Sequence, residues 1–175
     1  MSTRQDPIAG DGAWLADQLR RGFDGDPWHG SSLARILADV DAPAAAARPL
    51  PAAHAIWEIV LHVTGWTREV TRRLGGAPPA PPPEGDWPEV GPATPERWRA
   101  ALDDLAAAHA QLERAVAGLP PARWRERVGT PRDIEAGTAV TCAQLVNGLV
   151  QHDAYHAGQI ALLKKGLAAG GPAAT

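Results

Sequence analysis

The stretch QHDAYHAGQIALL, residues 151–163, is the part of the sequence that most directly predicts the fold. Together with the residues just before it, this stretch contains a series of leucine, isoleucine and histidine residues spaced by four, three, four, four and three positions. The series is Leu145, Leu149, His152, His156, Ile160 and Leu163. This spacing is typical of one apolar face of an α-helix, with two histidines one turn apart on it. The Cβ atoms of such a pair are about 5–6 Å apart, so both imidazoles can reach one metal ion.

A third histidine lies on a second predicted helix, which runs from about His54 to Leu74 and ends at Gly75-Gly76. His62 shares the apolar face of this helix with Ile59 and Val63. Helical bundles commonly build metal sites from side chains on facing helices. The pattern by itself also allows three ordinary core histidines, although each would then need hydrogen-bond partners.

The remaining helical patterns predict an all-α four-helix bundle with short extra helices. Two further long helices are expected over about 11–22 and from Thr94 to Gly118, and the last helix over about 141–167. Short helical turns are expected after Ser31 or Ser32 and after Asp41. Residues 120–140 predict irregular structure that could include a short pair of strands.

A proline-rich segment, residues 76–95, separates the second and third long helices. It contains eight prolines, a composition that favours extended backbone over helix or central strand. Because the candidate metal ligands lie on both sides of it, we expect a crossover loop inside one domain spanning 1–175.

The composition restricts the classes of function. The chain has 17 basic and 20 acidic residues, a net charge of −3 and no basic run, which argues against a nucleic-acid partner. No apolar stretch reaches the roughly 18 residues of a membrane span, and the N-terminus shows no signal peptide, so we expect a cytoplasmic location. The only cysteine, Cys142, rules out an internal disulfide and a cysteine-based zinc cluster, and we interpret it as a core residue.

Three segments resemble the DinB/YfiT-like superfamily: WHGSSL (28–33), HAIWEIVLHV (54–63) and QHDAYHAGQI (151–160). The resemblance covers nearly the whole chain, and the last segment is its most specific part. It implies a four-helix bundle in which three histidines hold a divalent metal ion, one on the second helix and two on the fourth. The matching positions here are His62, His152 and His156.

The segment HDAYH, residues 152–156, is also similar to the zincin motif H-E-x-x-H. In that motif the acidic residue acts as the general base, but Asp153 is one methylene shorter than glutamate. Residues 157–175 contain no histidine, aspartate or glutamate to serve as a downstream third ligand. The sequence therefore does not predict a metalloprotease.

Several other polar residues carry weaker predictions. Glu58 lies one turn before His62 and could orient its ring, and Gln159 could hydrogen-bond a water on the metal. His54 is two turns from His62, too far to share its ligand role, and His29 matches a position near the pocket mouth in the family. His109 lies among alanines and is expected at the surface.

Three neutral ligands leave a divalent ion an open position, which is typical of catalytic sites. We therefore expect a metal-dependent enzyme acting on a small molecule, with zinc or nickel as the metal. The resemblance implies either a hydrolase or an S-transferase that uses a low-molecular-weight thiol as cosubstrate. The alternative is a non-catalytic metal- or ligand-binding stress-response protein, because no unambiguous general base is evident. We expect no nucleic-acid or membrane partner, and a homodimer is compatible with the sequence.

Overall fold

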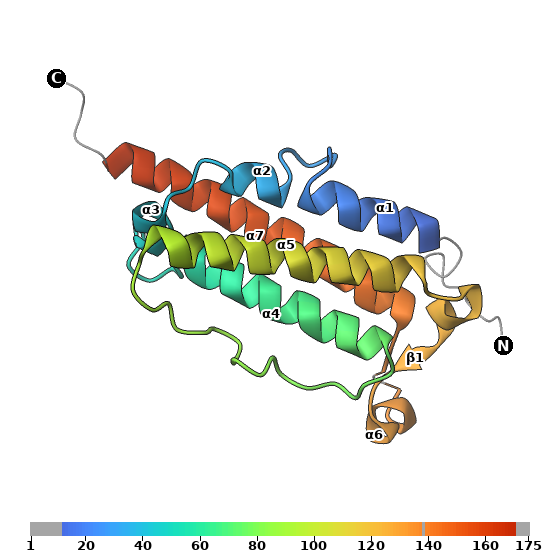
Figure 1. The fold of residues 1–175 in the computed structure, drawn as a ribbon. Helices are drawn as coiled ribbons and strands as arrows, with labels where there is room; N and C mark the ends of the chain where they lie inside the picture. The colour runs from blue at the N-terminus through green and yellow to red at the C-terminus, as the bar shows by residue number, and fades with distance from the viewer. Residues whose placement is uncertain (1–11, 138, 171–175) are drawn as a thin grey trace.

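Four long helices dominate the computed structural model, which describes residues 12–137 and 139–170 (Figure 1). They are α1 (Gly12–Phe23), α4 (Ile56–Leu74), α5 (Pro95–Ala117) and α7 (Cys142–Gly170). Helix α4 packs against α5 and α7, and α1 packs against the same two helices. The predicted all-α four-helix bundle is confirmed. In the described part of the chain, no helix is long and apolar enough to span a membrane.

The proline-rich segment is a long crossover. In Figure 1 it leaves the end of α4 and returns along the bundle before α5 begins, so α4 and α5 run in the same direction. Residues 77–94 contain no helix or strand, as the proline content predicted. Helix α5 then starts at Pro95, and Thr94 caps it by accepting a hydrogen bond from the Arg97 amide.

Short elements fill the other connections. They are α2 (Leu33–Leu37), α3 (Ala42–Ala46), the 3₁₀-helix η1 (Pro121–Arg125), β1 (Arg127–Val128), α6 (Pro131–Glu135) and β2 (Val140–Thr141). Strands β1 and β2 pair antiparallel, so the irregular region does contain the short strand pair. The Asp41 carboxylate caps α3 by accepting a hydrogen bond from the Ala44 amide at 2.9 Å. Helix α4 begins at Ile56, two residues later than expected.

Two apolar clusters form the core along the bundle. One contains Ile59 and Val63 of α4 with Ile160 of α7, and the other contains Val70 of α4 with Leu149 of α7. On α7, His152 and His156 lie between these groups, whereas on α4 His62 lies between Ile59 and Val63 of the first group. The histidines therefore lie near the boundary of the two clusters, since Val63, next to His62, is the last α4 residue of the first cluster.

One buried carboxylate ties the crossover to α4. The side chain of Glu69 is 2% exposed and accepts hydrogen bonds from Arg72, Arg73 and the backbone amide of Ala80, each at 2.8 Å. Burial alone would raise the pKa of Glu69, but the hydrogen bonds from Arg72, Ala80 and Arg73 outweigh it and hold the pKa below its usual range. Glu69 is therefore ionised at neutral pH and fixes the start of the crossover.

We expect Glu69→Ala to lower the free energy of unfolding by about 2–4 kcal/mol, because it removes a buried carboxylate that the Ala80 amide and two guanidinium groups use as their acceptor. Urea unfolding of the wild-type and variant proteins measures this change. The control is Asp104→Ala, which removes a 65% exposed carboxylate 3.3 Å from Arg68. That loss should not exceed about 1 kcal/mol. Equal losses in the two variants would contradict an anchoring role for Glu69.

Candidate metal centre

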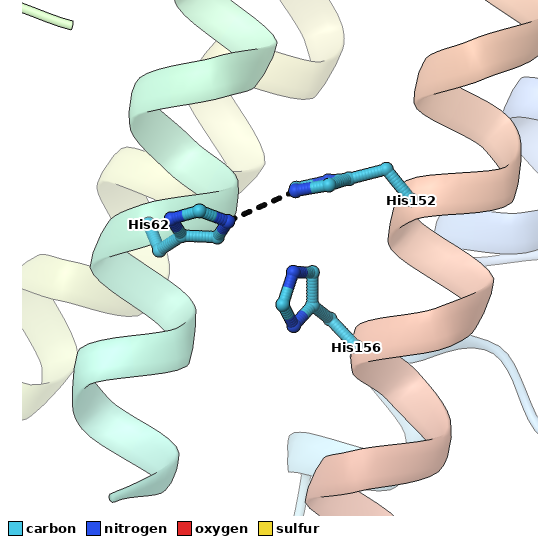
Figure 2. A group of neighbouring side chains, drawn as sticks. All are labelled: His62, His152 and His156. Atoms are coloured by element: carbon cyan, nitrogen blue, oxygen red, sulfur yellow. Dashed lines mark hydrogen bonds between the residues drawn. The ribbon is translucent and has the colours of Figure 1, made fainter. Parts of the chain in front are cut away.

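Three histidine side chains converge from α4 and α7, as Figure 2 shows. The Nε2 atoms of His62 and His152 are 2.9 Å apart, and His156 completes a group whose ligand nitrogens all lie within 4.8 Å of one another. His62 and His156 are buried, whereas the His152 side chain is 27% exposed. The structure therefore brings together all three of the residues that the sequence predicted as ligands.

The spacing of these nitrogens fits a small divalent ion. Zinc–nitrogen bonds of about 2.0–2.1 Å in a tetrahedral site place the nitrogens roughly 3.3–3.4 Å from one another. The distances in the group, 2.9 Å for one pair and up to 4.8 Å overall, lie on either side of that value. The three imidazoles are therefore close enough together to share one ion. Imidazole nitrogen suits zinc, copper, iron and nickel alike.

Each imidazole also has a polar group at its other nitrogen. The Nδ1 atom of His62 donates to the backbone carbonyl of Asp86 at 2.6 Å, and Nδ1 of His156 lies 2.7 Å from Oε1 of Gln159. The Nδ1 atom of His152 faces Oδ1 of Asp153 at 3.4 Å. With the proton on Nδ1, the lone pair of Nε2 points toward the shared centre, which is how metal-ligating histidines are usually held.

The proline-rich crossover covers one side of the site. The indole ring of Trp87 stacks on His62, with ring centroids 4.0 Å apart and planes 7° apart. Its other face stacks on His54, at 3.6 Å and 3°. The carboxylate of Asp86 accepts a hydrogen bond from the indole of Trp66 at 2.8 Å. Sequence analysis missed Asp86 and Trp87, because an irregular segment has no periodicity that would show which side chains face the core.

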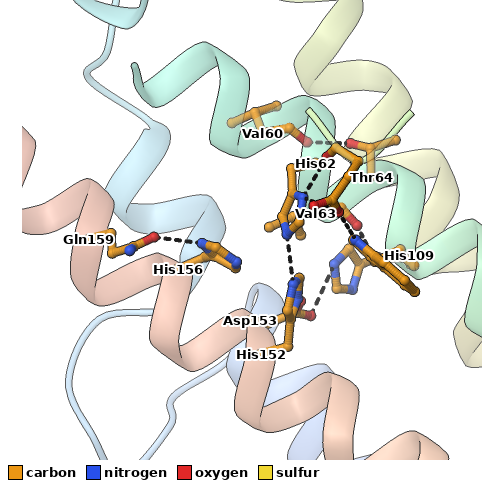
Figure 3. Close-up of polar contacts among 12 residues, drawn as sticks. Val60, His62, Val63, Thr64, His109, His152, Asp153, His156 and Gln159 are labelled. Carbon is orange, nitrogen blue, oxygen red and sulfur yellow. Dashed lines mark hydrogen bonds and ion pairs between the residues drawn. The ribbon is translucent and has the colours of Figure 1, made fainter. Parts of the chain in front are cut away.

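A second buried pair lies behind His152. Nε2 of His109 on α5 is 3.5 Å from Oδ2 of Asp153, whose other oxygen faces His152 (Figure 3). His109 is 1% exposed and stacks on Phe23 at 4.0 Å, so its expected surface position was wrong. The neighbouring alanines suggested a solvent-facing stretch. However, His109 follows Leu105 by four residues and precedes Leu112 by three, so it lies on the buried face of α5.

The other sequence interpretations have mixed outcomes. Glu58 does not orient His62: its carboxylate accepts hydrogen bonds from Arg48 at 2.6 Å and from the Ala55 amide at 2.7 Å. It therefore stabilises the start of α4, where unpaired amides favour an acidic side chain. Cys142 is buried, as expected, while His29 is exposed.

Burial favours the neutral form of these imidazoles. The pKa of His156 is lowered to about 4, mainly by burial and next by the neighbouring His152, with a smaller effect of His62. Burial also lowers the pKa of His62 and that of His109 below the usual histidine value. At neutral pH the buried imidazoles are therefore unprotonated, the form that a metal ion requires.

The fold and site together define a helical bundle with a buried three-histidine centre that fits a divalent metal. The family model of the DinB superfamily matches residues 28–160, a range that contains His62, His152 and His156. The chain belongs to the DinB superfamily. Searches of curated proteins and of solved structures found no match.

The metal-free protein should lose stability as the pH falls from about 6.5 to about 4. Unfolded histidine has a pKa near 6.5, so the unfolded chain binds protons in this range that folded His156 does not. With its pKa lowered to about 4, His156 alone accounts for a change on the order of 3 kcal/mol. Urea unfolding with a chelator at pH 7.5 and pH 4 tests this, and His156→Gln should flatten the dependence. The same slope in that variant would contradict the assignment to His156.

Asp153→Asn should weaken metal binding by about 10- to 100-fold, because the neutral amide gives less support to the His152 ring than a carboxylate does. Competition with a chelating indicator dye measures the affinity for zinc. The matched control is Asp103→Asn, since Asp103 is exposed on α5 and should leave the affinity unchanged. Equal affinity in wild-type and Asp153→Asn protein would show that Asp153 has no role in holding the ligand.

Proposed function

We propose that this protein is a metal-dependent enzyme that acts on a small molecule, with zinc or nickel held by His62, His152 and His156. The observation that carries the proposal is the convergence of three imidazoles that each have a polar partner on the far nitrogen. Three protein ligands leave one coordination position open, which is characteristic of catalytic rather than structural sites. We also propose that 1–175 form one domain, since α4 and α7 supply the ligands from both sides of the crossover.

The first candidate reaction is transfer to or from a low-molecular-weight thiol. A divalent ion at this centre would supply a Lewis acid that lowers the pKa of a coordinated thiol or water. Cys142 does not provide that thiol: it is buried ten residues before His152, about 15 Å along the helix axis. Burial also raises the pKa of the Cys142 thiol. The thiol therefore arrives as a cosubstrate, in line with the family resemblance.

The second candidate reaction is hydrolysis, favoured by the buried pair of Asp153 and His109. The two side chains lie 3.5 Å apart directly behind His152. A carboxylate paired with an imidazole can accept a proton and pass it on, which a hydrolase requires of its general base. Asp153 lies 3.4 Å from Nδ1 of His152, so the pair directly adjoins the three-histidine group.

The first experiment measures metal content. Protein loaded with zinc and freed of excess should retain about one ion per chain, and the variant with His62, His152 and His156 all changed to alanine should retain none. His29→Ala is the control, because His29 is exposed and outside the group, and it should retain the full amount. Stoichiometric zinc in the triple variant would show that the metal site lies elsewhere.

The second experiment separates the candidate reactions in cobalt-substituted protein. We expect low-molecular-weight thiols to produce sulfur-to-metal charge-transfer absorption that persists in Cys142→Ser and disappears in His156→Ala. No spectral change with thiols, together with turnover of simple esters or amides, would favour hydrolysis. Neither response would favour a non-catalytic metal- or ligand-binding protein.

A further inference from the structure

A pocket of about 320 Å³ lies between α4 and α7 and reaches His152. Its walls are mainly apolar and come from both helices and from β2: Trp66, Val70, Val140, Leu145 and Leu149. This volume is at the lower end of the range for small-molecule sites, which is about 300–1,000 Å³. A larger cavity of about 620 Å³ beside α1 and η1 is lined by none of the three histidines, so it has no connection to the candidate chemistry.

The pocket adjoins the accessible edge of the metal centre. His152 belongs both to the pocket wall and to the three-histidine group, and its side chain is the most exposed of the three. Trp87, which is not part of the pocket lining, covers His62 by stacking on its ring. A molecule that approaches the centre along the His152 side therefore places the rest of its body against the pocket walls.

The charges around the pocket do not favour a second ionic group on the ligand. The guanidinium of Arg73 lines the pocket, but its Nε is 2.8 Å from Oε1 of the buried Glu69 carboxylate, which pairs its charge. Gln144 is the only other polar side chain in the lining besides His152. Apolar surface removed from water is the main source of affinity that such walls can provide.

We propose that this pocket binds the apolar body of the substrate. The substrate class is then an amphipathic small molecule with an alkyl or aryl body and one polar head group, which lies next to His152. This inference rests on the proposed function, since the head group reaches the metal centre. It adds the chemical class of the ligand and the surface that selects it.

Gly148 offers a way to fill the pocket without disturbing the fold. It lines the pocket from within α7, and a Cβ atom added there would meet no atom within 4 Å. Glycine inside a helix lowers stability relative to alanine, so a side chain at this position suits the helix. Gly158 provides a matched control, because it lies on the same helix, has equal room for a Cβ atom and is outside the pocket lining.

The test uses linear alkyl hydroxamates, which share one metal-binding head and differ in the length of the body. Calorimetry with zinc-loaded protein measures their affinities, starting from acetohydroxamate. Affinity should rise about fourfold with each added methylene until the pocket is full, the factor expected for a buried CH₂ group. Gly148→Leu should bind acetohydroxamate as the wild type does and lose the gain from longer chains, whereas Gly158→Leu should keep it.

The outcomes distinguish this inference from the proposed function. If acetohydroxamate does not bind to zinc-loaded protein, the open metal site is wrong and both proposals fall. If acetohydroxamate binds but longer alkyl chains bind no more tightly, only the pocket is overturned. The same holds if the rise in affinity with chain length is equal in the wild type and in Gly148→Leu. Thermal melting and zinc content establish that each variant folds. Gly148→Ala, which adds one methyl group, should show a smaller loss for the longest chains, and no loss in either Gly148 variant would also overturn the pocket.

Discussion

The structure depends on three imidazoles, two of them buried, that α4 and α7 bring together near the boundary of the two apolar clusters. A buried imidazole is costly unless both ring nitrogens have a polar partner. Here the far nitrogens of His62 and His156 lie against Asp86 and Gln159, and that of His152 faces Asp153. Because Nδ1 of each ring has a polar neighbour, the other ring nitrogens are the ones that face one another, within 4.8 Å. A divalent cation would satisfy all three at once.

The proline-rich crossover lies close along the bundle, and its path brings polar and aromatic groups to His62. Since α4 and α5 run in the same direction, the chain has to return along their length (Figure 1). The returning segment is held by the Glu69 carboxylate at Ala80, and Pro82 packs closely against Gly65. These contacts bring Asp86 and Trp87 to His62. A segment without regular structure thus completes the site and protects one side of it from water.

Helix α7 connects the site to the rest of the bundle. On its inward side it carries two of the three histidines, and Asp153 reaches across to His109 on α5. Further toward its start, Leu145 and Leu149 form part of the apolar pocket beside His152. One helix therefore positions the ligands, supports one of them through a carboxylate and lines the surface next to the exposed edge. The pocket and the three-histidine group are therefore structurally connected, because α7 contributes to both.

Local periodicity determined what the sequence could reveal. The three- and four-residue spacing of apolar residues predicted the four long helices and placed His62, His152 and His156 on inward faces, because side-chain direction in a helix follows from its geometry alone. Only the tertiary structure decided which groups hold those histidines. Asp86 and Trp87 lie on an irregular segment whose path depends on contacts made with α4, and Glu58 turns to Arg48. The spacing from Leu105 and Leu112 places His109 on the buried face of α5, but only the tertiary structure brings it to Phe23 of α1 and Asp153 of α7. Such partners come from chain segments far apart in sequence or without a repeating direction, so no pattern within one segment determines them.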